Sequence, residues 1–123
     1  TRLPLLVGAT GRIFLAQFEE KRGKEIVQKM GLVRYTSKSV IDPKKFLKEV
    51  EEVRKRGYAI DDEEYLPGVR AVAAAIETTT LPPTAIWVVG FSSSLDDLKM
   101  EKIILEIQKT AQGISHSMKD DRR

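Results

Sequence analysis

Apolar residues recur every three or four positions in several stretches of the chain, which is the spacing of one face of an α-helix. The clearest stretch begins at Pro43, which suits the first helical position, and ends before Gly57, which suits the residue after the last turn. Asp42 is placed to cap the first turn. The apolar stripe consists of Phe46, Leu47, Val50 and Val53. We therefore predict an amphipathic helix between these signals.

The same periodicity predicts three further helices. The first follows Gly8-Ala9-Thr10-Gly11, with Thr10 as its N-cap, and the second is short and covers residues 24–30. The last is long and begins near Ser94 or Asp96, either of which can cap it. Its apolar positions are Met100, Ile103, Ile104, Ile107, Ala111, Ile114 and Met118.

Three segments are typical of β-strands. Residues 58–60 form a short candidate, and residues 69–77 and 85–91 form two longer ones. The link 78–84 between the longer strands contains two prolines and is predicted to be a turn. The two longer strands are therefore predicted to form an antiparallel hairpin. The elements together predict an α+β fold, in which helices flank an antiparallel sheet. Three strands are few for this many helices, so we expect part of the domain to precede Thr1.

The composition is that of one folded domain. The chain has 123 residues, of which 41% are hydrophobic and 32% charged. Its net charge of +3 comes from interleaved basic and acidic residues, whereas nucleic-acid binding favours a stripe of one sign. No apolar run is long enough to span a membrane. The absence of cysteine excludes disulfides and favours a cytoplasmic location.

The segment Gly8-Ala9-Thr10-Gly11 is a glycine-containing turn before a helix. Free backbone N–H groups at such a terminus can bind a carboxylate or a phosphate. The segment is not a P-loop, because no Gly-Lys-Ser/Thr sequence follows it. Taken alone, a tight turn capped by Thr10 is the favoured interpretation, and anion binding is the alternative.

Four carboxylates follow one another at Asp61-Asp62-Glu63-Glu64. Adjacent residues point in different directions, so these side chains do not form a facing catalytic pair. They also lack the alternate-ligand spacing of a calcium loop. A solvated turn is the favoured interpretation, except for Asp61, which ends a strand and could point inward.

Small residues dominate the segment 69–77, which contains Ala71, Ala73, Ala74 and Ala75. Strands prefer β-branched and aromatic residues, so these alanines leave space beside the sheet. A closely packed helix is the commoner reason for such space, and a ligand is the alternative. The next strand carries Trp87, Val89 and Phe91 on one face. A tryptophan there is more often a core residue than a ligand platform.

The sequence contains no recognisable catalytic arrangement. His116 is the single histidine and there is no cysteine, which makes a transition-metal site improbable. We find no Gly-x-Ser-x-Gly elbow, and no base lies near the Ser92-Ser93-Ser94 run in the sequence. We therefore expect no metal, no cofactor and no enzymatic activity.

Several segments, taken in order, resemble one family over essentially the whole chain. The most recognisable piece is residues 53–64, which include Gly57-Tyr58-Ala59-Ile60-Asp61, and residues 68–76 follow at the expected spacing. The other matching pieces are Leu3-Pro4-Leu5, Gly11-Arg12, Leu15-Ala16, residues 85–90 and Ile114-Ser115. This set resembles the effector-binding domain of the IclR-type bacterial and archaeal transcriptional regulators.

The resemblance implies a GAF-like fold, with a small-molecule pocket against an antiparallel sheet that helices flank. Members of the family place a winged helix-turn-helix domain ahead of this domain and work as dimers or tetramers on operator DNA. We accordingly expect residues 1–123 to form a single effector-binding domain that lacks its first strands. The DNA-binding domain is expected to lie outside this chain.

By position, the resemblance assigns the ligand-binding residues. They are Ala9, Thr10, Asp61, Ala71, Trp87 and Val89. Some members that bind small polar acids have Cys or Ser where this chain has Ala71, Trp87 and Val89. We therefore expect a less polar pocket, which either takes an apolar or aromatic organic acid or is partly closed by Trp87. The N–H groups of the Gly-containing turn would take a carboxylate at one end of the ligand, and Asp61 a hydroxyl at the other.

The sequence thus favours a ligand-sensing domain whose effector shifts its oligomeric or interdomain arrangement. A structural oligomerisation module, in which the alanine-rich strand packs against a helix and leaves no cavity, is the main alternative. A hydrolase that uses Asp61 and Glu64 ranks a distant third.

Overall fold

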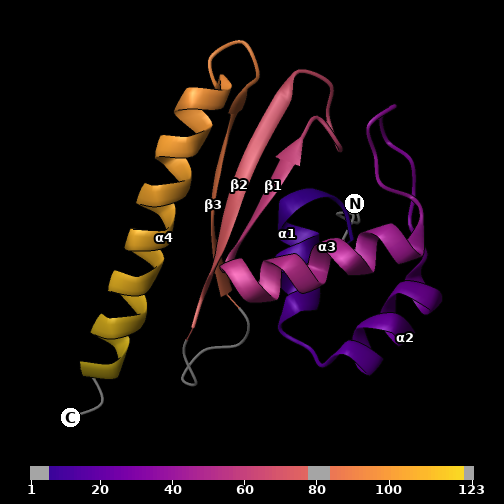
Figure 1. The fold of residues 1–123 in the computed structure, drawn as a ribbon, viewed down its shortest axis with the longest axis horizontal. Helices are drawn as coiled ribbons and strands as arrows, with labels where there is room; N and C mark the ends of the chain where they lie inside the picture. The colour runs from indigo at the N-terminus through magenta and orange to yellow at the C-terminus, as the bar shows by residue number, and fades with distance from the viewer. Residues whose placement is uncertain (1–5, 78–83, 121–123) are drawn as a thin grey trace, which may run out of the picture.

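The computed structural model describes residues 6–77 and 84–120, which form an α+β arrangement of helices around a three-stranded sheet (Figure 1). The helices are α1 (Gly8–Ala16), α2 (Glu20–Met30), α3 (Pro43–Arg56) and α4 (Asp97–Asp120). The strands are β1 (Tyr58–Asp62), β2 (Val69–Ile76) and β3 (Thr84–Phe91). The predicted link 78–84 lies outside the described residues except for Thr84, which begins β3.

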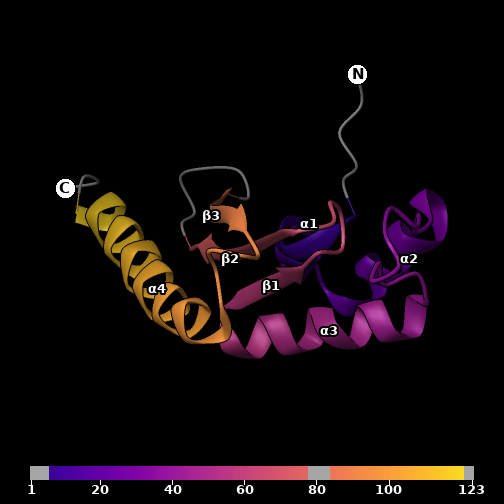
Figure 2. The same cartoon turned by 90° about the horizontal axis from the view of Figure 1, so that it is seen from above.

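The sheet is antiparallel, with the order β1-β2-β3, which confirms the predicted hairpin. In the register, Asp61 of β1 stands opposite Ala71 of β2, and Ala71 stands opposite Val89 of β3. The next row on the same face of the sheet joins Ala59, Ala73 and Trp87 in the same way. Figure 2 shows α4 on one side of the sheet and α1 on the other.

The face covered by α4 is a continuous apolar core. Val72, Ala74 and Ile76 of the sheet pack against α4, whose predicted apolar stripe faces them. The buried or half-buried helix residues are Met100, Ile103, Ile104, Ile107, Ala111 and Ile114. Their removal from water is the main contribution of this layer to stability, as for any amphipathic helix.

The packing on the opposite face of the sheet explains why the strands carry small alanine side chains there. Ala59 and Ala73 have no exposed surface, and they pack against Ala9 and Ile13 of α1 and Val53 of α3. Small side chains on the strands let α1 lie close to β1 and β2. The favoured interpretation of the alanine-rich strand, close helix packing, is therefore confirmed at Ala73. A third apolar cluster joins α1 to α2 and α3, and its buried residues are Leu6, Leu15, Val27, Phe46 and Val50.

Most of the predicted helix signals are confirmed. The side chain of Asp42 accepts a hydrogen bond from the backbone N–H of Lys44 at 3.1 Å, and Pro43 opens α3. Gly57 ends α3 in the left-handed conformation, with φ of 84°. At α4, the carboxylate of Asp96 accepts from the N–H of Lys99 at 2.9 Å, so Asp96 is the cap.

Two helix starts were predicted too late. Thr10 is not the N-cap of α1, because the helix already begins at Gly8 and Val7 stands at the cap position. The physical reason is that Ala9, only 1% exposed, packs into the core and draws the residues before Thr10 into the first turn. Likewise α2 begins at Glu20 rather than at residue 24, since its first turn is polar and gave no apolar signal.

Candidate functional site

The first turn of α1 meets the end of β1 at Asp61. Gly8 has φ of +65°, and a Cβ atom added to it would lie 2.9 Å from Cγ of Asp61 and overlap the carboxylate. The Oδ2 atom of Asp61 is therefore packed directly against the backbone of Gly8. No acidic residue lies in the first turn of α1, and Val7 provides no side-chain cap. The carboxylate of Asp61 thus stands at the positive end of the helix dipole.

The other oxygen of Asp61 accepts a hydrogen bond within the turn that follows β1. Its Oδ1 atom accepts a hydrogen bond from the backbone N–H of Glu64 at 2.8 Å. Burial raises the pKa of Asp61 above the ordinary value for an aspartate, while the N–H of Glu64 and the positive charge of Arg12 oppose this rise. Asp61 therefore points inward, as predicted, and it organises the turn that follows it.

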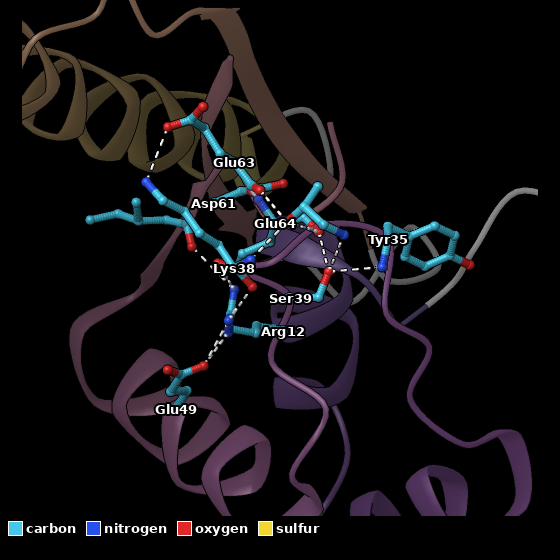
Figure 3. Close-up of polar contacts among 10 residues, drawn as sticks. Arg12, Tyr35, Lys38, Ser39, Glu49, Asp61, Glu63 and Glu64 are labelled. Carbon is cyan, nitrogen blue, oxygen red and sulfur yellow. Dashed lines mark hydrogen bonds and ion pairs between the residues drawn. The ribbon is translucent and has the colours of Figure 1, made fainter. Parts of the chain in front are cut away.

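A buried guanidinium lies beneath this turn (Figure 3). Arg12, only 3% exposed, donates from Nη1 and Nη2 to the two carboxylate oxygens of Glu64 at 3.1 and 2.6 Å. It also donates from Nε to Glu49 of α3 at 2.9 Å and from Nη1 to the carbonyl of Ile60 at 3.1 Å. Burial alone would lower the pKa of Arg12, but the carboxylates of Glu64 and Glu49 together raise it. This bidentate geometry joins α1, α3 and the turn after β1.

A loop between α2 and α3 holds the same turn from the other side. The hydroxyl of Ser39 donates to the backbone carbonyl of Glu64 at 2.6 Å and accepts from the N–H groups of Tyr35 and Thr36 at 2.9 Å each. The hydroxyl of Thr36 donates to the carbonyl of Glu63 at 2.6 Å. We call residues 35–39 the clasp, because these hydroxyls fix the loop onto the acidic turn (Figure 3).

The prediction of a solvated acidic turn was therefore wrong for Glu64, which is only 8% exposed. The reason is the buried Arg12, whose charge requires a carboxylate partner in the interior. Asp62 and Glu63 are more open to solvent and pair with Arg70 and Lys38 at 2.9 and 3.1 Å. For these two residues the turn is a set of surface ion pairs.

The sequence signal for Arg12 was present but was not used. Ala9, Arg12 and Leu15 are spaced three apart, so they lie on one face of α1, and the other two members are apolar. A charge on a buried helix face predicts an acidic partner elsewhere in the chain. Ser39 carried no comparable signal, because its role depends on where a loop lies in space.

The structure places the predicted strand residues in neighbouring rows on the α1 face of the sheet. Asp61, Ala71 and Val89 form one row, and Trp87 lies in the next row. Ala71 is 1% exposed, whereas Trp87 is 55% and Val89 is 48% exposed. The expectation that Trp87 is a core residue is therefore wrong within the described part of the chain, because α1 covers β1 and β2 more fully than β3.

The two residues assigned to the first turn of α1 have different surroundings. Ala9 packs against the sheet beside Ala59 and Ala73, next to Gly8 and therefore close to Asp61. Thr10 lies in the same turn but is exposed to solvent. Of this pair, Ala9 shapes the inner surface, and Thr10 stays a predicted polar contact.

Two hollows among the described residues lie elsewhere. One, of about 440 Å³, is lined mainly by the end of α3 and by α4, including Arg56, Gln108 and Gln112. Another, of about 330 Å³, is apolar and lies between β3 and α4, where Val88 and Ile103 line it. None of the predicted site residues lines either hollow. Among the described residues, no group of three or more His, Asp or Glu side chains could hold a metal ion.

Replacing Gly8 with Ala tests the contact between α1 and Asp61. The free energy of unfolding is expected to fall by about 1–3 kcal/mol, because φ of +65° is costly for alanine and the new Cβ displaces the carboxylate. Urea denaturation followed by circular dichroism measures the change. Gly113→Ala in α4 is the matched control: nothing lies within 4 Å of the added Cβ, so stability should be kept or raised. Equal stability of Gly8→Ala and the unchanged chain would contradict the contact.

The comparisons with known proteins agree with this architecture. Residues 1–116 match the family described as the bacterial transcriptional regulator IclR C-terminal domain, and the chain belongs to that family. The transcriptional repressor IclR of Escherichia coli is 30% identical over 115 residues, which are 93% of this chain and 42% of the repressor. The repressor AllR of the same species is 29% identical over 119 residues, or 96% of this chain and 44% of AllR. The chain thus spans less than half the length of these relatives.

Solved structures give the same result. The Thermotoga maritima IclR has a TM-score of 0.80 and 30% identity, over 89% of this chain and 45% of that one. A double mutant of the PobR inducer-binding domain from Acinetobacter, solved with 3-hydroxybenzoic acid, has a TM-score of 0.85 over 94% of this chain and 67% of that one. At a sequence identity of 24%, this similarity shows a shared fold and nothing further. The predicted fold, that of an IclR effector domain, is confirmed.

Proposed function

We propose that this chain is the small-molecule-sensing domain of a DNA-binding transcriptional regulator. The observation that carries the proposal is the position of Asp61 in β1. Its half-buried carboxylate lies against the first turn of α1, in one row of the sheet with Ala71 and Val89. Half-buried polar groups beside apolar surface are typical of small-molecule sites. DNA binding would belong to a separate domain of the regulator. We propose that the regulator acts in the cytoplasm. None of the described helices is long and apolar enough to cross a membrane.

The surface around Asp61 favours an apolar or aromatic effector. Trp87 and Val89 offer exposed apolar surface on the same face of the sheet, and Ala71 lies in the row between Val89 and Asp61. The similarity to the PobR inducer-binding domain, whose double mutant was solved with 3-hydroxybenzoic acid, supports an aromatic acid as the first compound to test. In this proposal Asp61 and Thr10 make the polar contacts.

The exposed side of β3 also bears on the extent of the domain. Among the described strands β3 is an edge strand, yet Trp87, Val89 and Phe91 are 48–70% exposed on one of its faces. Natural edge strands are usually protected by charges, by bulges or by covering segments. We therefore propose that further strands of the sensor domain pair with β3. We also propose that the domain works as a dimer or tetramer, as the family resemblance implies.

The alternative function is an oligomerisation module without a ligand, in which this same exposed face of β3 would contact another copy of the chain. The effector experiment distinguishes the two functions. A compound at about 100 times its dissociation constant should stabilise the fold by about 2.7 kcal/mol, which is visible as a rise in melting temperature. The sensor predicts such a rise for at least one compound in a panel of aromatic and small organic acids, together with a change in Trp87 fluorescence. The module predicts no rise for any of them.

Replacing Asp61 with Ala should weaken binding of the compound found in this way. Losing a hydrogen bond to a charged acceptor costs about 1.5–3 kcal/mol, or roughly a tenfold to hundredfold rise in the dissociation constant. Isothermal titration calorimetry measures it, and circular dichroism checks that the variant is folded. Asp97→Ala, on the other side of the sheet and 92% exposed at its side chain, is the control that should keep the affinity. An unchanged affinity in Asp61→Ala would remove Asp61 from the site.

A further inference from the structure

The hollow of about 440 Å³ lies where the end of α3 meets the later turns of α4 and the end of β2. The C-terminal end of α3 points toward α4 (Figure 1). Ala74 of β2 and Ala111 of α4, which are 1% and 4% exposed, form the base of the hollow. Its volume is in the range of pockets that hold small molecules. Asp61 does not line it, so this hollow is separate from the proposed effector site.

Two cations that line the hollow are not paired with carboxylates. Lys55 stands four residues after Glu51, in the order that favours an ion pair on a helix, and Arg56 stands in the same relation to Glu52. Neither ion pair forms among the described residues, where Glu51 pairs with Arg54 instead. Two positive charges therefore remain at the hollow.

Arg56 is held in place without the use of its terminal nitrogens. Its Nε atom donates to the carbonyl of Tyr58 at 3.0 Å, and its guanidinium lies 4.4 Å from the centre of the Tyr58 ring. These two contacts orient the guanidinium, while its Nη atoms make no hydrogen bond to any described residue. A guanidinium with these donors free can bind two oxygens of one phosphate or carboxylate group.

The carbonyl groups at the end of α3 are already bound to donors of the protein. The carbonyl of Arg56 accepts from the side-chain amide of Gln108 at 2.9 Å, and the carbonyl of Val53 accepts from the N–H of Gly57 at 2.8 Å. The last turn of α3 also carries three basic residues, whose charge opposes the negative end of the helix dipole. An anion at this helix end therefore meets cations and satisfied carbonyls.

The rest of the lining offers mainly hydrogen-bonding groups. Gln112 and Ser115 of α4 contribute an amide and a hydroxyl, and Glu77 contributes the one carboxylate among the described residues that line the hollow. Such groups bind the hydroxyls of a sugar-like molecule better than they bind an apolar ring. The volume is also much larger than an inorganic anion fills, so the lining indicates a ligand with a polar body and an anionic end.

We propose that this hollow is a second ligand site, which binds a small phosphorylated metabolite with its phosphate group at Lys55 and Arg56. The hydroxyl groups of the ligand then lie toward Gln112, Ser115 and Glu77. A phosphate is favoured over a carboxylate because it carries more negative charge and a third acceptor oxygen, which the two cations share. The proposal does not depend on the effector site at Asp61.

Three probes that differ at one carbon atom test the proposal. They are glucose 6-phosphate, glucuronate, which has a carboxylate in that place, and glucose, which has neither anion. NMR signals of the Gly57 backbone amide and the Gln108 side-chain amide are followed as each probe is added, at constant ionic strength near neutral pH. We expect glucose 6-phosphate to shift both signals to saturation, with a dissociation constant at least about ten times lower than that of glucuronate. Glucose should cause no shift at the same concentrations.

A double variant, Lys55→Gln with Arg56→Gln, assigns this binding to the two cations. It should raise the dissociation constant of glucose 6-phosphate at least about tenfold. Both side chains are exposed, so the variant is expected to fold. The matched control is Lys29→Gln with Arg22→Gln, which removes the same charge from exposed positions of α2 and should keep the affinity.

Four results would overturn the proposal. The first is the absence of any shift with glucose 6-phosphate at millimolar concentration. The second is binding of glucose, and the third is binding of glucuronate, as tightly as glucose 6-phosphate. The fourth is an equal loss of affinity in the two double variants, because that would show a general attraction of anions to a chain of net charge +3. None of these results affects the effector site at Asp61.

Discussion

Replacing Arg12 with Ala is expected to lower the free energy of unfolding by about 3–5 kcal/mol. The change leaves Glu64, only 8% exposed, without a counter-ion, and its carboxylate then faces Glu49 and Asp61. Burial already raises the pKa of Glu64, and the hydrogen bonds from Arg12 are the main opposing influence. Without them the buried charge must take up a proton, admit water or open the turn.

Urea denaturation near neutral pH measures this loss. Arg22→Ala is the matched control, since Arg22 forms an exposed pair with Glu25 three residues later in α2 and should contribute well under 1 kcal/mol. The double variant Arg12→Met with Glu64→Leu should recover much of the stability, because it removes both buried charges together. A loss below about 1 kcal/mol for Arg12→Ala would mean that the ion pair does not hold α1 to the acidic turn.

Replacing Phe46 with Ala is expected to cost a similar amount, about 3–5 kcal/mol. Phe46 is 1% exposed and fills the space between α1, α2 and α3, beside Leu15 and Val50. The guanidinium of Arg12 lies 5.5 Å from the centre of its ring, so the phenyl group also shields the buried ion pair. Truncation therefore creates a cavity and admits water to the charges.

The shift in urea midpoint measures this second effect, with Val33→Ala as the control. Val33 is 58% exposed in the loop before the clasp, so its truncation should change stability by less than about 0.5 kcal/mol. Phe46→Leu should lie between the two, because it keeps part of the buried volume. Equal losses for Phe46→Ala and Val33→Ala would contradict the described core.

The elements that the sequence predicted well are those with local signals. The bounds of α3 follow from Asp42, Pro43 and Gly57, which act within a few residues of themselves. The strand alternation also placed Trp87 and Val89 on one face before the register was known. A period of two and a cap depend only on neighbouring residues, so a single sequence carries them.

The parts that were missed depend on long-range contacts. Glu64 was assigned to solvent because nothing near it in the sequence shows that Arg12, 52 residues away, lies beneath it. The residue type of Trp87 favoured burial in the core over a ligand contact, whereas its exposure depends on how far α1 extends over the sheet. Thr10 was chosen as a cap by residue type, but the packing of Ala9 set the helix start.

The clasp has a consequence for how the chain can vary among relatives. The loop between α2 and α3 has the exposed polar character of segments that usually tolerate insertions. Yet Thr36 and Ser39 both bind the carbonyls of the acidic turn, so the spacing between them must match the spacing of Glu63 and Glu64. Changes in loop length should therefore accumulate before Thr36 and after Ser39, and the three-residue step between them should stay constant even where the residues themselves change.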